Sequence, residues 1–239
     1  MTMADLESLR VTVRPLLDLS APADALPAYY ALYHPPSRTR LYVDEDASGR
    51  VRGFVAVCQT GQQLFQPTVV LRTPSAGAAV ELLRQALVPG RPYTVVTTPD
   101  LRDAVAEVVE IDQPQISHIY RLDLVHFQSE INVLVVAERG LGGRPRFVIR
   151  SQGEVVSEAG VSWRSPHFAE VFVRTVPTAR RRGWGRAVLT ACTAWVVRSA
   201  SLPLYVVGER NGPSLALAEA AGYVDSSARE YGGEGVCRG

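Results

Sequence analysis

The feature that most constrains the fold of this chain is a pattern of strands that occurs twice along the sequence. A polar turn at Gly49 leads into an apolar run, and a polar turn at Gly153 does the same. The similar strings VVLRT at 69–73 and VFVRT at 171–175 follow these runs. Short apolar runs between polar turns are typical of buried strands. The two halves of the chain are therefore predicted to share one arrangement.

The second part of the pattern is helical. After each VxLRT-like string, apolar residues recur with the spacing of a helix. A short, strand-like apolar run then begins with proline, at Pro92 in the first half and at Pro203 in the second. Each half reads strand, strand, strand, helix, strand, helix. This order predicts an α/β fold with two tandem units, each a mixed, mostly antiparallel sheet flanked by helices. We place the boundary between Tyr120 and Glu130, which gives domains at 1–125 and 126–239.

Composition excludes several classes of function. The 239 residues carry a net charge of +1, which is no electrostatic footprint for nucleic acid, and no stretch approaches a membrane-spanning length. All basic residues are arginine, so lysine chemistry is excluded. Cys58, Cys192 and Cys237 are scattered and have no metal-ligand spacing to the histidines, so we expect no metal site and no disulfide framework. We expect Cys192 in the core and Cys237 near a mobile chain end, in a soluble cytoplasmic protein.

The string RRRGWG at 180–185 stands between a predicted strand and a predicted helix. The first N–H groups of a helix have no intrahelical partner and favour negative charge. Gly183 and Gly185 leave the backbone accessible to a diphosphate, and arginines can add charge-assisted bonds. The spacing differs from the P-loop and from the three-glycine dinucleotide pattern. The alternative interpretation is a solvated basic turn.

The spacing Arg180-x-x-Gly183-x-Gly185 resembles the acyl-CoA loop of the GNAT superfamily of N-acyltransferases. The string FAEVFV before it resembles the family's central strand, and the segment 211–223 resembles its Asn-led helix that ends in glycine and an aromatic residue. The resemblance covers about Arg146 to Tyr223. It implies acetyl-CoA as co-substrate, bound by Val173, Thr175, Arg180, Arg181, Arg182, Gly183, Trp184, Gly185, Arg186, Asn211 and Ser214.

The first half resembles a degenerate GNAT unit. The segment TPSAG at 73–77 stands where the second half has its arginine-glycine loop, and it has one glycine and no basic residue. We therefore expect acyl-CoA binding only in the second unit.

Acyl transfer to an amine needs a base, because an alkylamine with a pKa of about 10.4 is almost fully protonated at neutral pH. The resemblance implies that Glu170 takes this proton, although an exposed carboxylate at a strand start is an equal alternative. Glu158 is the reserve candidate. The backbone N–H of Val176 or Thr175 is the expected oxyanion donor.

The departing thiolate is often protonated in the family by a tyrosine, but Ala218 stands at that position here. Tyr205, Tyr223, Ser214 or water could replace it. Asn211 before Gly-Pro is also an ordinary helix cap, and we favour the cap alone. Trp163, His167 and Trp184 are weak candidates for lining an acceptor pocket.

We conclude from the sequence that the chain is an N-acetyltransferase acting by direct attack of a primary amine on acetyl-CoA. The acceptor is expected to be a small molecule or a peptide, with no nucleic-acid or membrane partner. The alternative is a non-catalytic acyl-CoA-binding or regulatory protein, favoured by the missing tyrosine. A nucleic-acid binder that uses the arginines at 180–182 is a remote third possibility.

Overall fold

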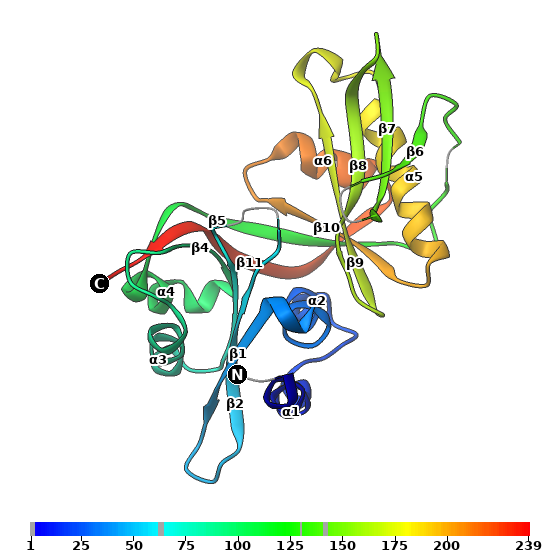
Figure 1. The fold of residues 1–239 in the computed structure, drawn as a ribbon. Coiled ribbons are helices and arrows are strands. Elements are labelled where there is room, and N and C mark those ends of the chain that lie inside the picture. Colours follow the sequence, from blue (N-terminus) through cyan, green and yellow to red (C-terminus); the bar gives the residue numbers. More distant parts are fainter. Residues whose placement is uncertain (1–2, 62–64, 130, 141–142) are drawn as a thin grey trace. The chain divides into compact units, whose positions relative to one another are not determined.

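The computed structural model describes residues 3–61, 65–129, 131–140 and 143–239 (Figure 1). Its contacts divide the chain into two compact units. Unit 1 contains the residues up to Ser117 together with Arg229–Gly239, and unit 2 is His118–Ala228. Two long strands, β5 (Val109–Leu122) and β11 (Tyr223–Cys237), have residues in both units.

Unit 1 begins with helices that the sequence patterns did not predict and continues with the predicted order of strands and helices. Besides its parts of β5 and β11, unit 1 contains α1 (Met3–Val13), α2 (Pro22–Ala28), a π-helix (Tyr29–Tyr33), β1 (Thr39–Glu45), β2 (Val51–Cys58), β3 (Thr68–Arg72), α3 (Ala76–Ala86), β4 (Pro92–Thr97) and α4 (Arg102–Val108). Three short 3-10 turns, Arg14–Leu16, Pro36–Arg38 and Pro99–Leu101, connect them.

Unit 2 follows the second copy of the pattern. Its elements are β6 (Val136–Arg139), β7 (Pro145–Ser151), β8 (Glu154–Arg164), β9 (Phe168–Thr175), a 3-10 turn (Pro177–Ala179), α5 (Trp184–Arg198), β10 (Leu202–Gly208) and α6 (Gly212–Ala220). The strand order is β1-β2-β3-β4-β11 in unit 1 and β5-β10-β9-β8-β7-β6 in unit 2.

The two units share their strand pairing. In unit 1, β2 is antiparallel to β3, and β3 is parallel to β4 across the α3 connection. In unit 2, β8 is antiparallel to β9, and β9 is parallel to β10 across α5. This is the predicted mixed sheet with helices, present twice.

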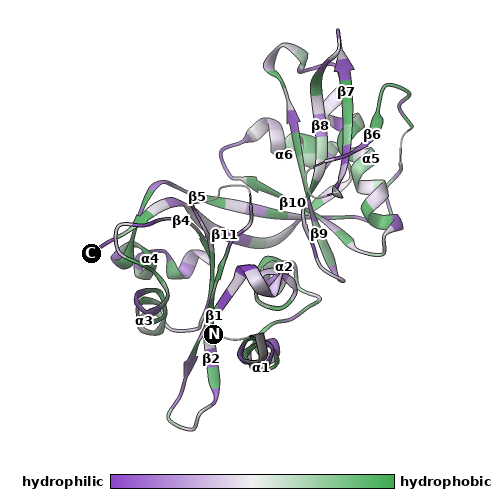
Figure 2. Cartoon of the chain, viewed as in Figure 1, coloured by the Kyte–Doolittle hydropathy of each residue, from purple (hydrophilic) through white to green (hydrophobic). Residues whose placement is uncertain are grey.

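Each unit has a hydrophobic core between its sheet and its long helix. In unit 1, Leu83 of α3 packs with Val69 and Val95, and all three are fully buried. In unit 2, Val188 and Cys192 of α5 are buried in one cluster with residues of β7, β8 and β9. Figure 2 shows hydrophobic segments along the strands and along α5. Burial raises the pKa of the Cys192 thiol to about 12, as expected for a core cysteine.

The end of β11 differs from the sequence-based expectation. Cys237 was predicted near a mobile end, but it is buried in the core of unit 1 and ends β11. Residues 231–236 pair antiparallel with β4. Unit 1 therefore includes the segment 229–239, which the sequence-based boundary had assigned to the second domain.

Candidate active site

The connection from β9 to α5 is shaped by two left-handed residues. Arg181 has a φ of 60° and Gly183 a φ of 74°. Gly183 is the residue before α5, and it provides no side chain to cap the helix. A left-handed residue without a side chain leaves the backbone at the start of α5 accessible.

Gly185 lies in a tightly packed position. A Cβ at this position would lie 3.1 Å from Oγ1 of Thr175, which is tighter than an ordinary contact. Oγ1 of Thr175 is itself 2.9 Å from Oγ of the buried Ser157. The start of α5 thus approaches the end of β9 closely.

Four arginine side chains surround this turn, and all four are exposed: Arg180, Arg181, Arg182 and Arg186. Arg180 Nε donates to the carbonyl oxygen of Thr175 at 3.4 Å. The guanidinium of Arg182 stacks over the ring of Trp184, 5.0 Å from its centroid, which occupies this indole in a cation–π contact.

The outer half of β9 has an open edge. β9 pairs with β10 only from Phe168 to Glu170. The Val176 N–H donates to the Val156 carbonyl at 3.0 Å, and alternate residues of an antiparallel strand direct their backbone groups to opposite sides. The N–H groups of Val173 and Thr175 therefore point away from β8, toward the side where β10 has separated. Of the two expected oxyanion donors, Val176 is excluded because its N–H is already bonded.

Glu170 lies where β9 and β10 separate, and its backbone is paired with that of Leu204. Nε1 of the buried Trp163 donates to Glu170 Oε2 at 2.5 Å. Burial raises the pKa of the Glu170 carboxyl, while hydrogen bonds from Trp163 and Ser162 oppose the shift. The interpretation of Glu170 as an exposed strand-start carboxylate is therefore wrong. Trp163 supports this carboxylate, whereas His167 is exposed.

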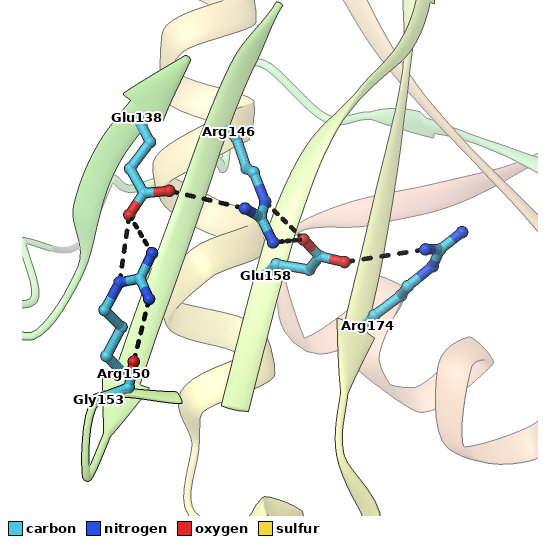
Figure 3. Close-up of polar contacts among 6 residues, drawn as sticks. All are labelled: Glu138, Arg146, Arg150, Gly153, Glu158 and Arg174. Atoms are coloured by element: carbon cyan, nitrogen blue, oxygen red, sulfur yellow. Dashed lines mark hydrogen bonds and ion pairs between the residues drawn. The ribbon is translucent and has the colours of Figure 1, made fainter. Parts of the chain in front are cut away.

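Glu158 is engaged in an ion-pair network across the sheet (Figure 3). Its Oε2 accepts from Nε and Nη2 of Arg146 at 2.7 and 2.6 Å. Arg174 lies 3.9 Å from its other oxygen, and Glu138 binds Arg146 and Arg150 on the far side. Charge-assisted contacts of this kind hold a carboxylate in a fixed orientation. The reserve candidate for the base is thus a member of an ion-pair network within the sheet.

The residues around α6 divide into caps and buried hydroxyls. Oδ1 of Asn211 accepts from the Ser214 N–H at 3.3 Å, so Asn211 caps α6. Burial raises the pKa of the Tyr205 phenol, and the nearby Ser214 side chain opposes this shift. Tyr223 is buried in the core and bonded to Thr193 at 2.6 Å, which excludes it as a proton donor to substrate. The proximity of Tyr205 in β10 to Ser214 in α6 has no signal in the local sequence.

No protein-family model matches the sequence, and no curated protein sequence does. Solved structures match the fold instead. A Drosophila protein is 13% identical and has a TM-score of 0.66, over 99% of this chain and 97% of that chain. A GCN5-related N-acetyltransferase from Kribbella flavida is 16% identical and has a TM-score of 0.61, over 89% of this chain and 96% of that chain.

A tandem GNAT protein from the clavulanic acid biosynthesis pathway is 17% identical and has a TM-score of 0.57, over 100% of this chain and 97% of that chain. The chain has a tandem GNAT fold. At these identities the similarity establishes the fold alone, and the GNAT units differ in the details of their βα turns.

The turn of the first GNAT unit is closed by side chains. Ser75 caps α3 by accepting from the Ala78 N–H at 3.3 Å, where the second unit has Gly183. The Thr97 hydroxyl donates to the Leu71 carbonyl at 3.1 Å and so occupies the edge of β3. These contacts occupy a backbone N–H at the helix start and a backbone carbonyl at the strand edge, and the equivalent groups are accessible in the second unit.

Two further findings concern the described residues only. They contain no group of three or more His, Cys, Asp or Glu side chains that could hold a metal ion. None of their helices combines the length and hydropathy needed to cross a membrane.

Proposed function

We propose that the protein is an N-acyltransferase that moves an acetyl or other acyl group from acetyl-CoA to a primary amine, with the chemistry in unit 2. The observation that carries the proposal is the continuity of two accessible backbone features. The open edge of β9, at Val173 and Thr175, is followed after a short turn by the helix start at Gly183, which no side chain caps.

The turn before α5 suits the diphosphate of coenzyme A. Backbone N–H groups at a helix start bind phosphate. The exposed residues Arg180 and Arg181 lie in this turn, and the exposed Arg186 lies in the first turn of α5. A charge-assisted hydrogen bond contributes about 1.5 to 3 kcal/mol. Several such bonds are sufficient for micromolar binding.

The edge of β9 suits the amide groups of the pantetheine arm. An extended chain with alternating amides can add to an open strand edge as another strand would. The N–H and carbonyl of Val173 have this orientation, and the Thr175 N–H is the remaining candidate for an oxyanion donor. When bound, acetyl-CoA supplies the acyl group as a thioester.

Glu170 is the proposed base. An amine with a pKa of about 10.4 is neutral in about one molecule in 2,500 at pH 7, a penalty of about 4.6 kcal/mol. Burial raises the pKa of Glu170 above its ordinary value, which makes this carboxylate a stronger proton acceptor than an exposed one. The hydrogen bond from Trp163 fixes its orientation.

Tyr205 and Ser214 are the proposed groups near the departing sulfur. The raised pKa keeps Tyr205 protonated at neutral pH, so its hydroxyl can donate a hydrogen bond. A thiolate with a pKa of about 8.5 does not need a full proton transfer in order to leave. The buried Ala218 at the usual tyrosine position therefore does not exclude catalysis.

A second candidate function is that of a non-catalytic acyl-CoA sensor, and Ala218 is the observation that favours it. Thiol release from acetyl-CoA across a panel of primary amines separates the two functions. Turnover with any amine above the rate without enzyme supports the transferase. Acetyl-CoA binding without turnover across the panel supports the sensor.

The base is tested with three glutamate variants. Glu170→Gln should lower kcat/KM by about 10² to 10⁴ at pH 7 and by less at high pH, where the amine is already neutral. Glu158→Gln should have a much smaller effect, because Glu158 is held by Arg146. Glu154→Gln, at an exposed position of β8, is the matched control. Equal losses in Glu170→Gln and Glu154→Gln would contradict the assignment.

The acyl-CoA loop is tested by ligand-induced stabilisation. At one hundred times its Kd, acetyl-CoA should stabilise the protein by about 2.7 kcal/mol. Gly185→Glu should remove this effect, because its carboxylate would meet the diphosphate, and circular dichroism checks that the variant is folded. An unchanged Tm increase in this variant would contradict the loop assignment.

A further inference from the structure

Unit 1 contains a cleft of roughly 780 Å³ that the proposed transferase chemistry does not use. It is formed where β1 begins, where β2 ends, and where α3 turns into β4, and all of its described lining residues belong to unit 1. The βα turn of unit 1, from Arg72 to Ala76, is not part of its lining. A volume of this size is typical of a site for a small organic molecule.

Three arginines line the cleft, Arg38, Arg40 and Arg91, and its described lining contains no Asp or Glu. Other arginines of unit 1 are paired with carboxylates, as Arg72 is with Asp24. Within the described part of the chain, no ion pair involves the guanidinium groups of Arg38, Arg40 and Arg91, and all three residues are exposed. Three positive charges without counter-charges make the cleft attractive to anions.

The alternation of side chains along the strands places charged groups beside apolar ones in the cleft. Arg40 lies opposite Val57 in the β1–β2 pairing, and it shares a face with Tyr42, two residues further along β1. Arg91 lies just before β4, two residues before the buried Tyr93. Tyr42 and Val57 pack against the hydrophobic core beneath. The cleft therefore offers cationic groups next to aromatic and aliphatic surface.

The end of α3 explains why this part of the sheet is not covered. The helix ends at Ala86, and the Val88 N–H donates to the Tyr93 hydroxyl at 3.0 Å, which fixes the chain to β4 at that point. The carbonyl end of α3 contributes about half a negative charge. Three full positive charges outweigh it, so the net field still favours an anion.

We propose that this cleft binds a small organic anion, a molecule with at least one phosphate or carboxylate group attached to an aromatic or aliphatic body. The guanidinium groups of Arg38, Arg40 and Arg91 bind the anionic group, and Tyr42 and Val57 contact the apolar body. The site belongs to unit 1 and is independent of acyl transfer in unit 2.

The test is isothermal titration of the full chain with 1-naphthyl phosphate, with 1-naphthol and inorganic phosphate as controls. Naphthyl phosphate should bind at least tenfold more tightly than either control, and more weakly at high salt. Arg40→Gln and Arg91→Gln should each weaken binding by about tenfold, the value of one charge-assisted bond. Equal affinity for inorganic phosphate would overturn the apolar half of the proposal.

Two matched controls separate this site from other arginines. Arg84→Gln removes an exposed arginine of α3 that does not line the cleft, and Arg181→Gln removes one from the proposed acyl-CoA loop. Both should bind naphthyl phosphate within twofold of the parent chain. If Arg181→Gln loses binding and Arg40→Gln does not, the anion binds in unit 2 and the cleft proposal is overturned. Circular dichroism confirms that each exposed substitution leaves the fold intact.

Discussion

Because α5 approaches β9 closely, the effect of Gly185→Ala on stability should depend on the side chain at position 175. Alanine at position 185 would place a Cβ 3.1 Å from Oγ1 of Thr175 and 3.6 Å from Cδ2 of Leu217. Only the first contact is tight. Overpacking costs about 1 to 3 kcal/mol, and the helix propensity of alanine offsets up to about 1 kcal/mol. With the full offset, Gly185→Ala should therefore destabilise unit 2 by up to about 2 kcal/mol.

Removal of the opposing hydroxyl should reverse this result. Thr175→Ala deletes Oγ1 and leaves the Ser157 hydroxyl without its partner, at a cost of about 1 to 3 kcal/mol. In that background Gly185→Ala has no tight contact and should be neutral or stabilising by up to about 1 kcal/mol. The double-mutant cycle should give a coupling of up to about 3 kcal/mol.

Urea unfolding followed by tryptophan fluorescence measures this cycle. All three tryptophans, Trp163, Trp184 and Trp195, lie in unit 2. Gly77→Ala is the matched control, because Gly77 is also the second residue of its helix and its nearest atom is 3.8 Å away. It should raise the stability of unit 1, measured by circular dichroism. Equal destabilisation by Gly185→Ala in both backgrounds would refute the steric argument.

Three further predictions concern other parts of the chain. The folded-state pKa of Glu170 lies above its ordinary value of 4.5, so stability falls as pH rises from that value through the folded pKa. Glu170→Gln should therefore stabilise the protein at pH 8 and have little effect near pH 4; a difference that does not vary with pH, in urea unfolding, would contradict this. Asn211→Ala should cost about 1 kcal/mol by loss of the α6 cap, and Asn211→Asp should restore most of it in the same assay. Gly232→Ala should lower the Tm of unit 1 strongly, because its Cβ would overlap the Val95 carbonyl oxygen; a Tm within 2 °C of the parent, about 1 kcal/mol or less, would show that β11 does not hold this register.

The order of elements could be predicted because the pattern depends on local periodicity. The strand predicted at 69–73 is observed as β3 (Thr68–Arg72), and the helix predicted after Gly185 begins at Trp184. Because one face of such a strand or helix is buried, its apolar residues recur with a period that can be read in the sequence. The N-terminal helices were missed because α1 has little amphipathic contrast between its faces.

The site was harder to predict because its electrostatics depend on pairs of residues far apart in the chain. Glu158 was a plausible base by sequence, and only the structure shows that its carboxylate is paired with Arg146 of β7. The environment of Glu170 likewise depends on Trp163 of the neighbouring strand. The end of β11 was misjudged because the last residues of a domain are commonly poorly ordered. Gly232, Gly233 and Gly235 instead permit close strand packing, since a Cβ on each would collide with a neighbouring strand.

The sharing of β11 has a consequence for biosynthesis. Unit 1 includes residues 229–239, which leave the ribosome after the whole of unit 2. At 5 to 20 residues per second, about 6 to 24 s separate Ser117 from Gly239. During this interval β4 lacks the strand that pairs with residues 92–97. The N-terminal unit is thus the last to be completed on a nascent chain, which reverses the usual order for tandem domains.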